Sequence, residues 1–244
     1  MRLPHSARSK RLYSGSSYHR VEMSCRHRLP GVKLALLMLL FPALVLAQTT
    51  QEREASSVAV AGICGPLENA VGPYDYRTAT PAQRHIVENY HFTPPVEALR
   101  HGATGAIGAD LDYTLRAFPN HARALYALCS YAQRLKTTRL TGAHYPAECY
   151  FERAVRFRPD DAQVRALYAD FLIAFKRPND AKLQLEEAER LDPPSPQIIY
   201  NLGLAWANLG NYEKALAYAK RAYAAGVQFP GLRAKLKAVG AWRD

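Results

Sequence analysis

Histidine is the side chain in this sequence best suited to metal binding or proton transfer, and five histidines follow residue 47. They are His85, His91, His101, His121 and His144. No two are spaced as the HxxxH or HExxH pairs that place two imidazoles on one helical face, and no CxxC pair exists. His91 meets Asp110 or Asp112 only if the tertiary fold brings them together. The spacing therefore predicts no metal site.

Phosphate-binding and nucleophile motifs are also missing. Gly102, Gly105 and Gly108 have no preceding strand-like run and no following Gly-Lys-Ser, which favours a helix-entry loop over a phosphate loop. The chain has neither a GxSxG sequence nor the signature of an activated cysteine. We therefore expect no catalytic residue and no cofactor.

Length, composition and charge indicate what kind of fold positions these residues. The chain has 244 residues, of which 48% are hydrophobic and 22% charged, as in an ordinary folded protein. Residues 1–47 hold 8 of the 32 basic and 1 of the 21 acidic side chains, so +7 of the net charge of +11 lies there. The remaining net charge of +4 is too small for strong binding of nucleic acid by the body of the protein.

The first 47 residues have the pattern of a secretory signal peptide. Residues 34–47 form an apolar run that basic residues precede and that ends in Val45-Leu46-Ala47, which predicts cleavage after Ala47. The run is shorter than the roughly 20 residues of a bilayer span, and Pro42 interrupts it, so a permanent anchor is disfavoured. Translation starting at Met23 would give a signal of ordinary length. We expect a flexible linker over 48–57 and a periplasmic or secreted protein.

The C-terminal half of the chain repeats with a period of 34 residues. Ala147 and Ala181 are separated by this distance, as are Pro159 and Pro193, and RALYA occurs twice, at 123–127 and 165–169. The spacing is that of a helix–turn–helix repeat, and it resembles the tetratricopeptide repeat. The resemblance is most specific in the last unit, where Leu202-Gly203, Trp206, Ala215 and Ala222 fill the packing positions of the two helices.

These repeats predict an all-α solenoid. We expect a loop-rich cap with a degenerate helical repeat over 58–118, tetratricopeptide-like repeats over 119–228 and a capping helix over 229–244. The two copies of RALYA are 42 residues apart, so eight extra residues lie in the first turn, around 136–145. Within the cap, helices are expected near 95–101 and 111–119, and 58–94 is expected to be mostly loop.

Three cysteines follow the predicted signal peptide, and the compartment is expected to be oxidising. Cys129 occupies the same repeat position as Ala205, a small buried site, so packing accounts for it. Cys64 lies in the loop-rich cap, where a bridge would contribute about 2–4 kcal/mol. We predict a disulfide between Cys64 and Cys149, with Cys129–Cys149 or no bridge as the alternatives.

A repeat array with no catalytic cluster indicates a binding function. In tetratricopeptide arrays the first helices line a concave groove, and the resemblance implies a peptide-binding groove lined by Leu128, Tyr131, Gln163, Asp170, Ile173, Tyr200, Asn201, Leu204 and Asn208. We expect a non-catalytic adaptor or scaffold whose partner is a protein or peptide of the cell envelope. The alternative is an envelope enzyme or small-ligand protein with a site between the cap and the first repeat, built from Tyr76, His91 or Asp110.

The chain also resembles, over nearly its whole expected mature length, a group of uncharacterised bacterial tetratricopeptide proteins of the cell envelope. The segments that carry this resemblance are CGPLENAVGPYDYR, HFTPPVEAL, DLDYTLRAFPNH and AECYFERA. This resemblance implies location in the cell envelope and a tetratricopeptide-repeat fold, but it implies no particular activity. The oligomeric state is left open.

Overall fold

The computed structural model describes residues 62–243. The predicted signal peptide (1–47), the linker (48–57) and the first residues of the cap lie outside this part of the chain. Between residues 62 and 243 the regular elements are all helices, and none has the length and apolar character needed to cross a membrane. The prediction of an all-α fold is confirmed.

The helices follow one another along the chain with short connections. Their bounds are α2 Pro81–Tyr90, α3 Pro94–Glu97, α4 Ile107–Ala117, α5 Ala122–Leu135, α6 Ala147–Phe157, α7 Ala162–Ala174, α8 Pro178–Arg190, α9 Pro196–Asn208, α10 Tyr212–Ala224 and α11 Gly231–Ala238.

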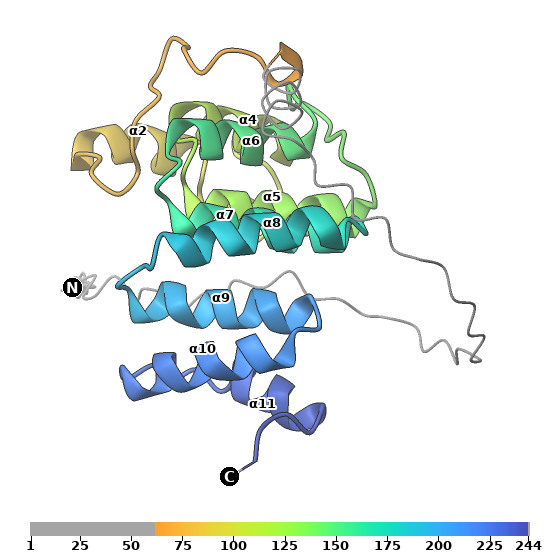
Figure 1. Cartoon of the computed structure of the whole chain (residues 1–244). Coiled ribbons are helices and arrows are strands. Elements are labelled where there is room, and N and C mark those ends of the chain that lie inside the picture. The colour runs from red at the N-terminus through yellow and green to blue at the C-terminus, as the bar shows by residue number, and fades with distance from the viewer. Residues whose placement is uncertain (1–61, 244) are drawn as a thin grey trace, which may run out of the picture.

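Successive helices pair into repeats that stack along one direction. Helix α7 packs against α8 and α9 against α10, while the first helices α5, α7 and α9 also contact one another. Figure 1 shows this stack running from α4 and α6 through α9 and α10 to α11 at the C-terminal end. The arrangement is that of a short helical solenoid.

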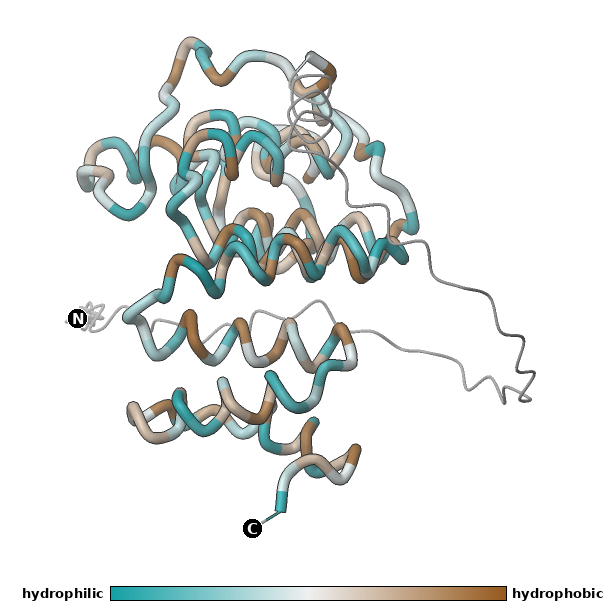
Figure 2. Tube along the Cα trace, viewed as in Figure 1, coloured by the Kyte–Doolittle hydropathy of each residue, from teal (hydrophilic) through white to brown (hydrophobic). Residues whose placement is uncertain are grey.

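The sequence signals identified above explain the pairing. The alanines of the 34-residue period, Ala181, Ala188, Ala215 and Ala222, are fully buried between helices. A Cβ added at Gly203 would lie 2.7 Å from Leu232 Cδ2, so a larger side chain there would push α11 away. Figure 2 shows hydrophobic residues on every helix of the stack. The first helices α7 and α9 bury most of their residues, whereas the second helices α8 and α10 bury one narrow stripe each.

The cap differs from its prediction in two places. Residues 58–94 were expected to be mostly loop, but α2 forms there, because Pro81 begins it and Thr80 and Gln83 make a reciprocal capping box. The helix expected at 95–101 is only the short α3, whereas α4 covers the helix expected near 111–119. The extra residues of the first repeat form the long turn between α5 and α6, as predicted.

Candidate functional site

The structure buries most of the groove that the repeats predict. Five of its residues have exposed fractions of 5% or less: Leu128, Asp170, Tyr200, Asn201 and Leu204. The other four are half-buried: Tyr131, Gln163, Ile173 and Asn208. The prediction that the first five line an open surface is wrong, because these side chains pack between helices.

At Tyr200 the covering element is the C-terminal segment. The backbone N–H of Leu232 donates a 3.0 Å hydrogen bond to the Tyr200 hydroxyl, and the Phe229 ring lies 5.5 Å from the Tyr200 ring. Leu232 and Leu236 of α11 are fully buried. Their spacing predicted a capping helix, but spacing within α11 does not say which residues of α9 it covers.

Asp170 belongs to a buried polar chain that links three helices. Its Oδ1 accepts a 2.8 Å hydrogen bond from Asn208 Nδ2, and Lys235 of α11 donates to Asn208 Oδ1. Burial raises the pKa of Asp170 to about 7, opposed by Asn208 and Lys235. This carboxyl is therefore a structural group that titrates near neutral pH, and it does not face a ligand.

Two half-buried residues of the predicted groove lie at equivalent positions of neighbouring first helices. Tyr131 of α5 and Ile173 of α7 are separated by the 42-residue distance between the two RALYA copies, and α5 packs directly on α7. Both lie against the main hydrophobic core without being covered by it. Arg134 lies over the Tyr131 ring, 5.2 Å from its centroid. We call Tyr131, Arg134 and Ile173 the first-helix patch.

The cap holds the residues of the alternative, enzyme-like site, and the fold separates them into three clusters. In the first, His91 Nδ1 lies 3.2 Å from Asp110 Oδ1. The same carboxylate accepts hydrogen bonds from the Thr104 hydroxyl at 2.6 Å and the Ala103 N–H at 2.7 Å. Burial opposes ionisation, but these hydrogen bonds outweigh it and lower the pKa of Asp110. Asp110 therefore ties down the loop that precedes α4.

Asp112, the other carboxylate near His91 in sequence, faces a different side. It accepts a 2.5 Å hydrogen bond from the Tyr150 hydroxyl and a 2.9 Å bond from Arg116 Nε, and it lies 2.8 Å from His144 Nδ1. His144 is in the long turn between α5 and α6. Asp112 thus anchors the inserted turn to α4 and α6, a role that the sequence pattern did not reveal.

The third cluster joins α2 to the first repeat. The Tyr76 hydroxyl donates a 2.5 Å hydrogen bond to Glu88, and His121 Nε2 lies 3.6 Å from the same oxygen. Burial, with Glu88 next, raises the pKa of Tyr76 to about 12, and hydrogen bonding by His121 and Tyr76 lowers the pKa of Glu88 to about 2. His121 is fully buried, and its Nδ1 accepts the N–H of Ala124 at the start of α5.

These clusters do not combine into one pocket. An open cavity of about 420 Å³ runs along α2, and of the groups just described only Glu88 lines it. The Tyr76 hydroxyl and His91 already have partners inside the fold. No group of three or more His, Cys, Asp or Glu side chains in residues 62–243 is placed to hold a metal ion. The cavity along α2 therefore does not contain the Tyr76, His91 or Asp110 side chains from which the alternative site was expected to be built.

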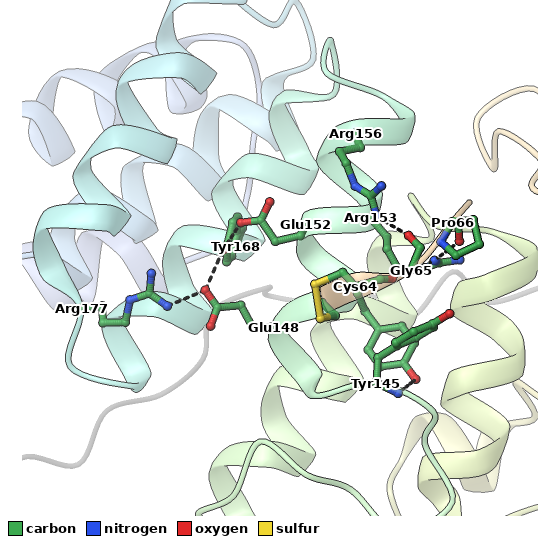
Figure 3. The surroundings of a disulfide bond; sticks show 12 residues. Cys64, Gly65, Pro66, Tyr145, Glu148, Glu152, Arg153, Arg156, Tyr168 and Arg177 are labelled. Atoms are coloured by element: carbon green, nitrogen blue, oxygen red, sulfur yellow. Dashed lines mark hydrogen bonds and ion pairs between the residues drawn. A yellow bond between two sulfur atoms is a disulfide. The ribbon is translucent and has the colours of Figure 1, made fainter. Parts of the chain in front are cut away.

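Figure 3 shows how the segment before α2 is fastened to α6. A disulfide joins Cys64 to Cys149, the pairing predicted from the sequence, and both residues are buried. On one side of the bond, Arg153 and Arg156 point at the backbone of residues 64–66. On the other side, the Tyr168 hydroxyl lies within hydrogen-bond distance of the carboxylates of Glu148 and Glu152, which share its one hydrogen and connect α7 to α6.

Comparison with known proteins gives one match. A family model described as tetratricopeptide repeat matches residues 106–231, just over half of the 244 residues. No match was found to a curated protein or to a solved structure. The matched range begins near the start of α4 and ends at the start of α11, so it contains the three helix pairs and leaves out α2 and the segment before it.

Proposed function

Because the chain belongs to the tetratricopeptide repeat family, we propose that it is a non-catalytic adaptor that binds segments of proteins of the cell envelope. Tetratricopeptide repeats generally mediate protein–protein interaction. Two features of the chain itself support the envelope as its compartment: the signal-peptide pattern that ends at Ala47, and a disulfide between Cys64 and Cys149.

The observation that carries this proposal is the first-helix patch. An aromatic and a branched aliphatic side chain occupy equivalent positions of two first helices that pack on each other, and a guanidinium lies over the aromatic ring. When such a cluster is buried in a complex, its apolar surface is removed from contact with water, which favours binding, and the arginine can pair with a polar group of the ligand. The patch therefore replaces the deeper groove residues, such as Tyr200, as the proposed contact surface.

The test is chemical crosslinking and capture from an envelope fraction with the wild-type protein, a Tyr131→Ala/Ile173→Ala variant and a control. The control is Leu183→Ala, which removes an apolar side chain of α8 that is 43% exposed and lies outside the patch. We expect the wild type and the control to capture the same discrete proteins and the double variant to lose them, while all three keep the same helical spectrum.

Equal capture by all three proteins would contradict the proposal that the first-helix patch is the contact surface, and binding would then lie elsewhere on the protein. If the wild type captures no protein at all, the adaptor function itself is contradicted. The alternative, an envelope enzyme or small-ligand protein, would then be the better explanation.

A further inference from the structure

The segment that precedes α2 is bound to the helices through its backbone. We call residues 64–76 the strap; it has no helix beyond its first residue and runs above α4 and α6 in Figure 1. At its start, Arg153 donates to the carbonyl oxygens of Cys64, at 3.1 Å, and of Pro66. Arg156 donates to the carbonyl oxygen of Gly65 at 2.9 Å. Three consecutive carbonyls are thus held by two arginines.

Backbone recognition continues to the other end of the strap. The Tyr74 N–H donates to the carbonyl of Ala117 at 2.8 Å, and the Tyr76 N–H donates to Asn120 Oδ1 at 2.9 Å. Between the two ends, Asn69 Nδ2 donates to the carbonyl of Arg116 at 3.0 Å. The strap therefore lies on the end of α4 and on α6 as a bent, non-helical segment that is recognised largely through its backbone.

Side-chain contacts add specificity to this backbone recognition. The rings of Tyr74 and Tyr76 lie 5.8 and 5.6 Å from the ring of Phe118, which is fully buried. The Tyr76 ring is also 3.9 Å from the His121 ring. Two aromatic side chains two residues apart thus anchor one end of the strap.

In the described part of the chain, the side chains of Arg153 and Arg156 donate their hydrogen bonds to backbone carbonyl oxygens and not to carboxylates. Arg153 is 1% exposed, and within residues 62–243 neither Arg153 nor Arg156 has an ion pair with a carboxylate in the structure. The Nε atoms of both are buried without a hydrogen-bond partner. Burial lowers the pKa of Arg153. The hydrogen bonds of both guanidinium groups go to strap carbonyls, and Arg153 also lies over the Tyr145 ring, 5.0 Å from its centroid.

We propose that the surface beneath the strap is a second peptide-binding surface, which accepts a non-helical segment with a Tyr-x-Tyr sequence from a partner protein. We define this strap seat as residues 116–120 of the α4 end together with Arg153 and Arg156 of α6. The strap is its resident occupant, and the Cys64–Cys149 bond keeps it there. The strap seat uses different helices from the first-helix patch and does not depend on it.

The disulfide decides whether the seat is available. A dithiol reductant breaks the Cys64–Cys149 bond by two successive thiol–disulfide exchanges; the two cysteines gain two electrons and two protons, and the reductant becomes a disulfide. The strap is then held only by the noncovalent contacts described above. A tethered segment still competes at a high effective concentration, so a partner gains access when the strap is both unlatched and weakened.

The experiment weakens the strap and leaves every residue of the seat unchanged. The receptor is the full chain with Cys64→Ser, Asn69→Ala and Tyr74→Ala. The probe is a fluorescein-labelled peptide with the sequence of residues 64–77, in which Cys64→Ser prevents a covalent bond. Binding is measured by fluorescence anisotropy. We expect the receptor variant to bind at least about tenfold more tightly than the oxidised wild type, and we expect Tyr74→Ala/Tyr76→Ala in the peptide to abolish binding.

A seat-side change is the matched control. Arg156→Gln in the receptor variant removes the donor to Gly65, and we expect it to weaken the probe several-fold, whereas Tyr131→Ala/Ile173→Ala in the same receptor should leave it unchanged. Limited proteolysis reports whether the strap is released. A released strap without probe binding, or equal binding by the oxidised wild type, would overturn the proposal. Should the receptor variant lose its helical spectrum, Cys64→Ser/Tyr74→Ala, which also unlatches and weakens the strap but has one substitution fewer, replaces it, with the same two outcomes.

Discussion

The two ends of the solenoid are closed in different ways. At the N-terminal end the non-helical strap is fixed by a disulfide and by hydrogen bonds to its backbone, with Arg153 and Arg156 as donors. At the C-terminal end a helix, α11, buries Leu232 and Leu236 and places Lys235 in the polar chain that leads to Asp170. Each segment covers the helices at its own end of the repeat array.

The difference follows from what each segment can bury. A helix with leucines at positions i and i+4 presents one apolar stripe to its neighbour, so it docks by the same packing that joins the repeats. The strap contains glycines and prolines and few aliphatic side chains, so it has little apolar area to bury. A covalent bond and donors aimed at carbonyls substitute for a core. The comparison indicates that the N-terminal closure is the one that a chemical change can open.

The largest expected effect comes from removing that bond. In a Cys64→Ser/Cys149→Ser variant the unfolded chain gains the entropy of a loop of 85 residues, so we expect the free energy of unfolding to fall by about 4 kcal/mol. Urea unfolding followed by circular dichroism measures this, and proteolysis should begin within residues 64–76. As a control, Leu183→Ala should leave both unchanged. A loss below about 1 kcal/mol would mean that the noncovalent contacts suffice.

A smaller expected effect is the pH dependence of stability, which differs between the two ends of the solenoid. The pKa of Asp170 is raised by burial to about 7, above the unfolded value of 3.8, so the folded state binds the proton more tightly. This contribution to stability is complete below pH 3.8 and is lost as the pH rises through about 7. Between pH 5 and pH 8 the loss amounts to about 2–3 kcal/mol.

Asp170→Asn tests this contribution, because an amide Oδ1 still accepts the hydrogen bond of Asn208 but does not ionise. We expect the variant to lose less stability than the wild type between pH 5 and pH 8 in urea unfolding. Parallel pH profiles for the two proteins would show that Asp170 does not titrate in the folded state over this range.

The sequence predicted the structure best where the type and spacing of a residue are compatible with only one structural role. The alanines of the 34-residue period and Gly203 fit only between close helices, and they predicted the stack. The same reasoning failed at Tyr200 and Asp170, because a repeat position does not tell whether a later segment covers it. The C-terminal segment does so through Phe229, which precedes α11, and through Leu232 and Lys235 of α11; all three lie about 30 residues or more further along the chain.

The cap shows a second reason why prediction failed. Asp110 and Asp112 are two residues apart and were considered together with His91, yet they bind different loops because neighbours two apart on a helix do not share a face. The role of the arginines that hold the strap could not be predicted from the sequence, because their partners are backbone carbonyls, which have no sequence signature. Cys64–Cys149 was predictable because the loop-rich cap needed a crosslink.

The smallest effect tests the N-terminal junction with a pH dependence of opposite sign. Burial lowers the pKa of His121, although Glu88 opposes this shift, and its Nδ1 must stay unprotonated to accept the Ala124 N–H. Below about pH 6.5 the unfolded chain therefore binds a proton that the folded state resists, and stability falls as the pH falls.

His121→Asn keeps an acceptor at the start of α5 but does not titrate. We expect it to lower stability at neutral pH, through loss of ring packing with Tyr76 and Phe92, and to flatten the decline in stability between pH 7 and pH 5. A decline as steep as that of the wild type would place the acid sensitivity in another group, and the two ends would then no longer differ in the sign of their response to pH.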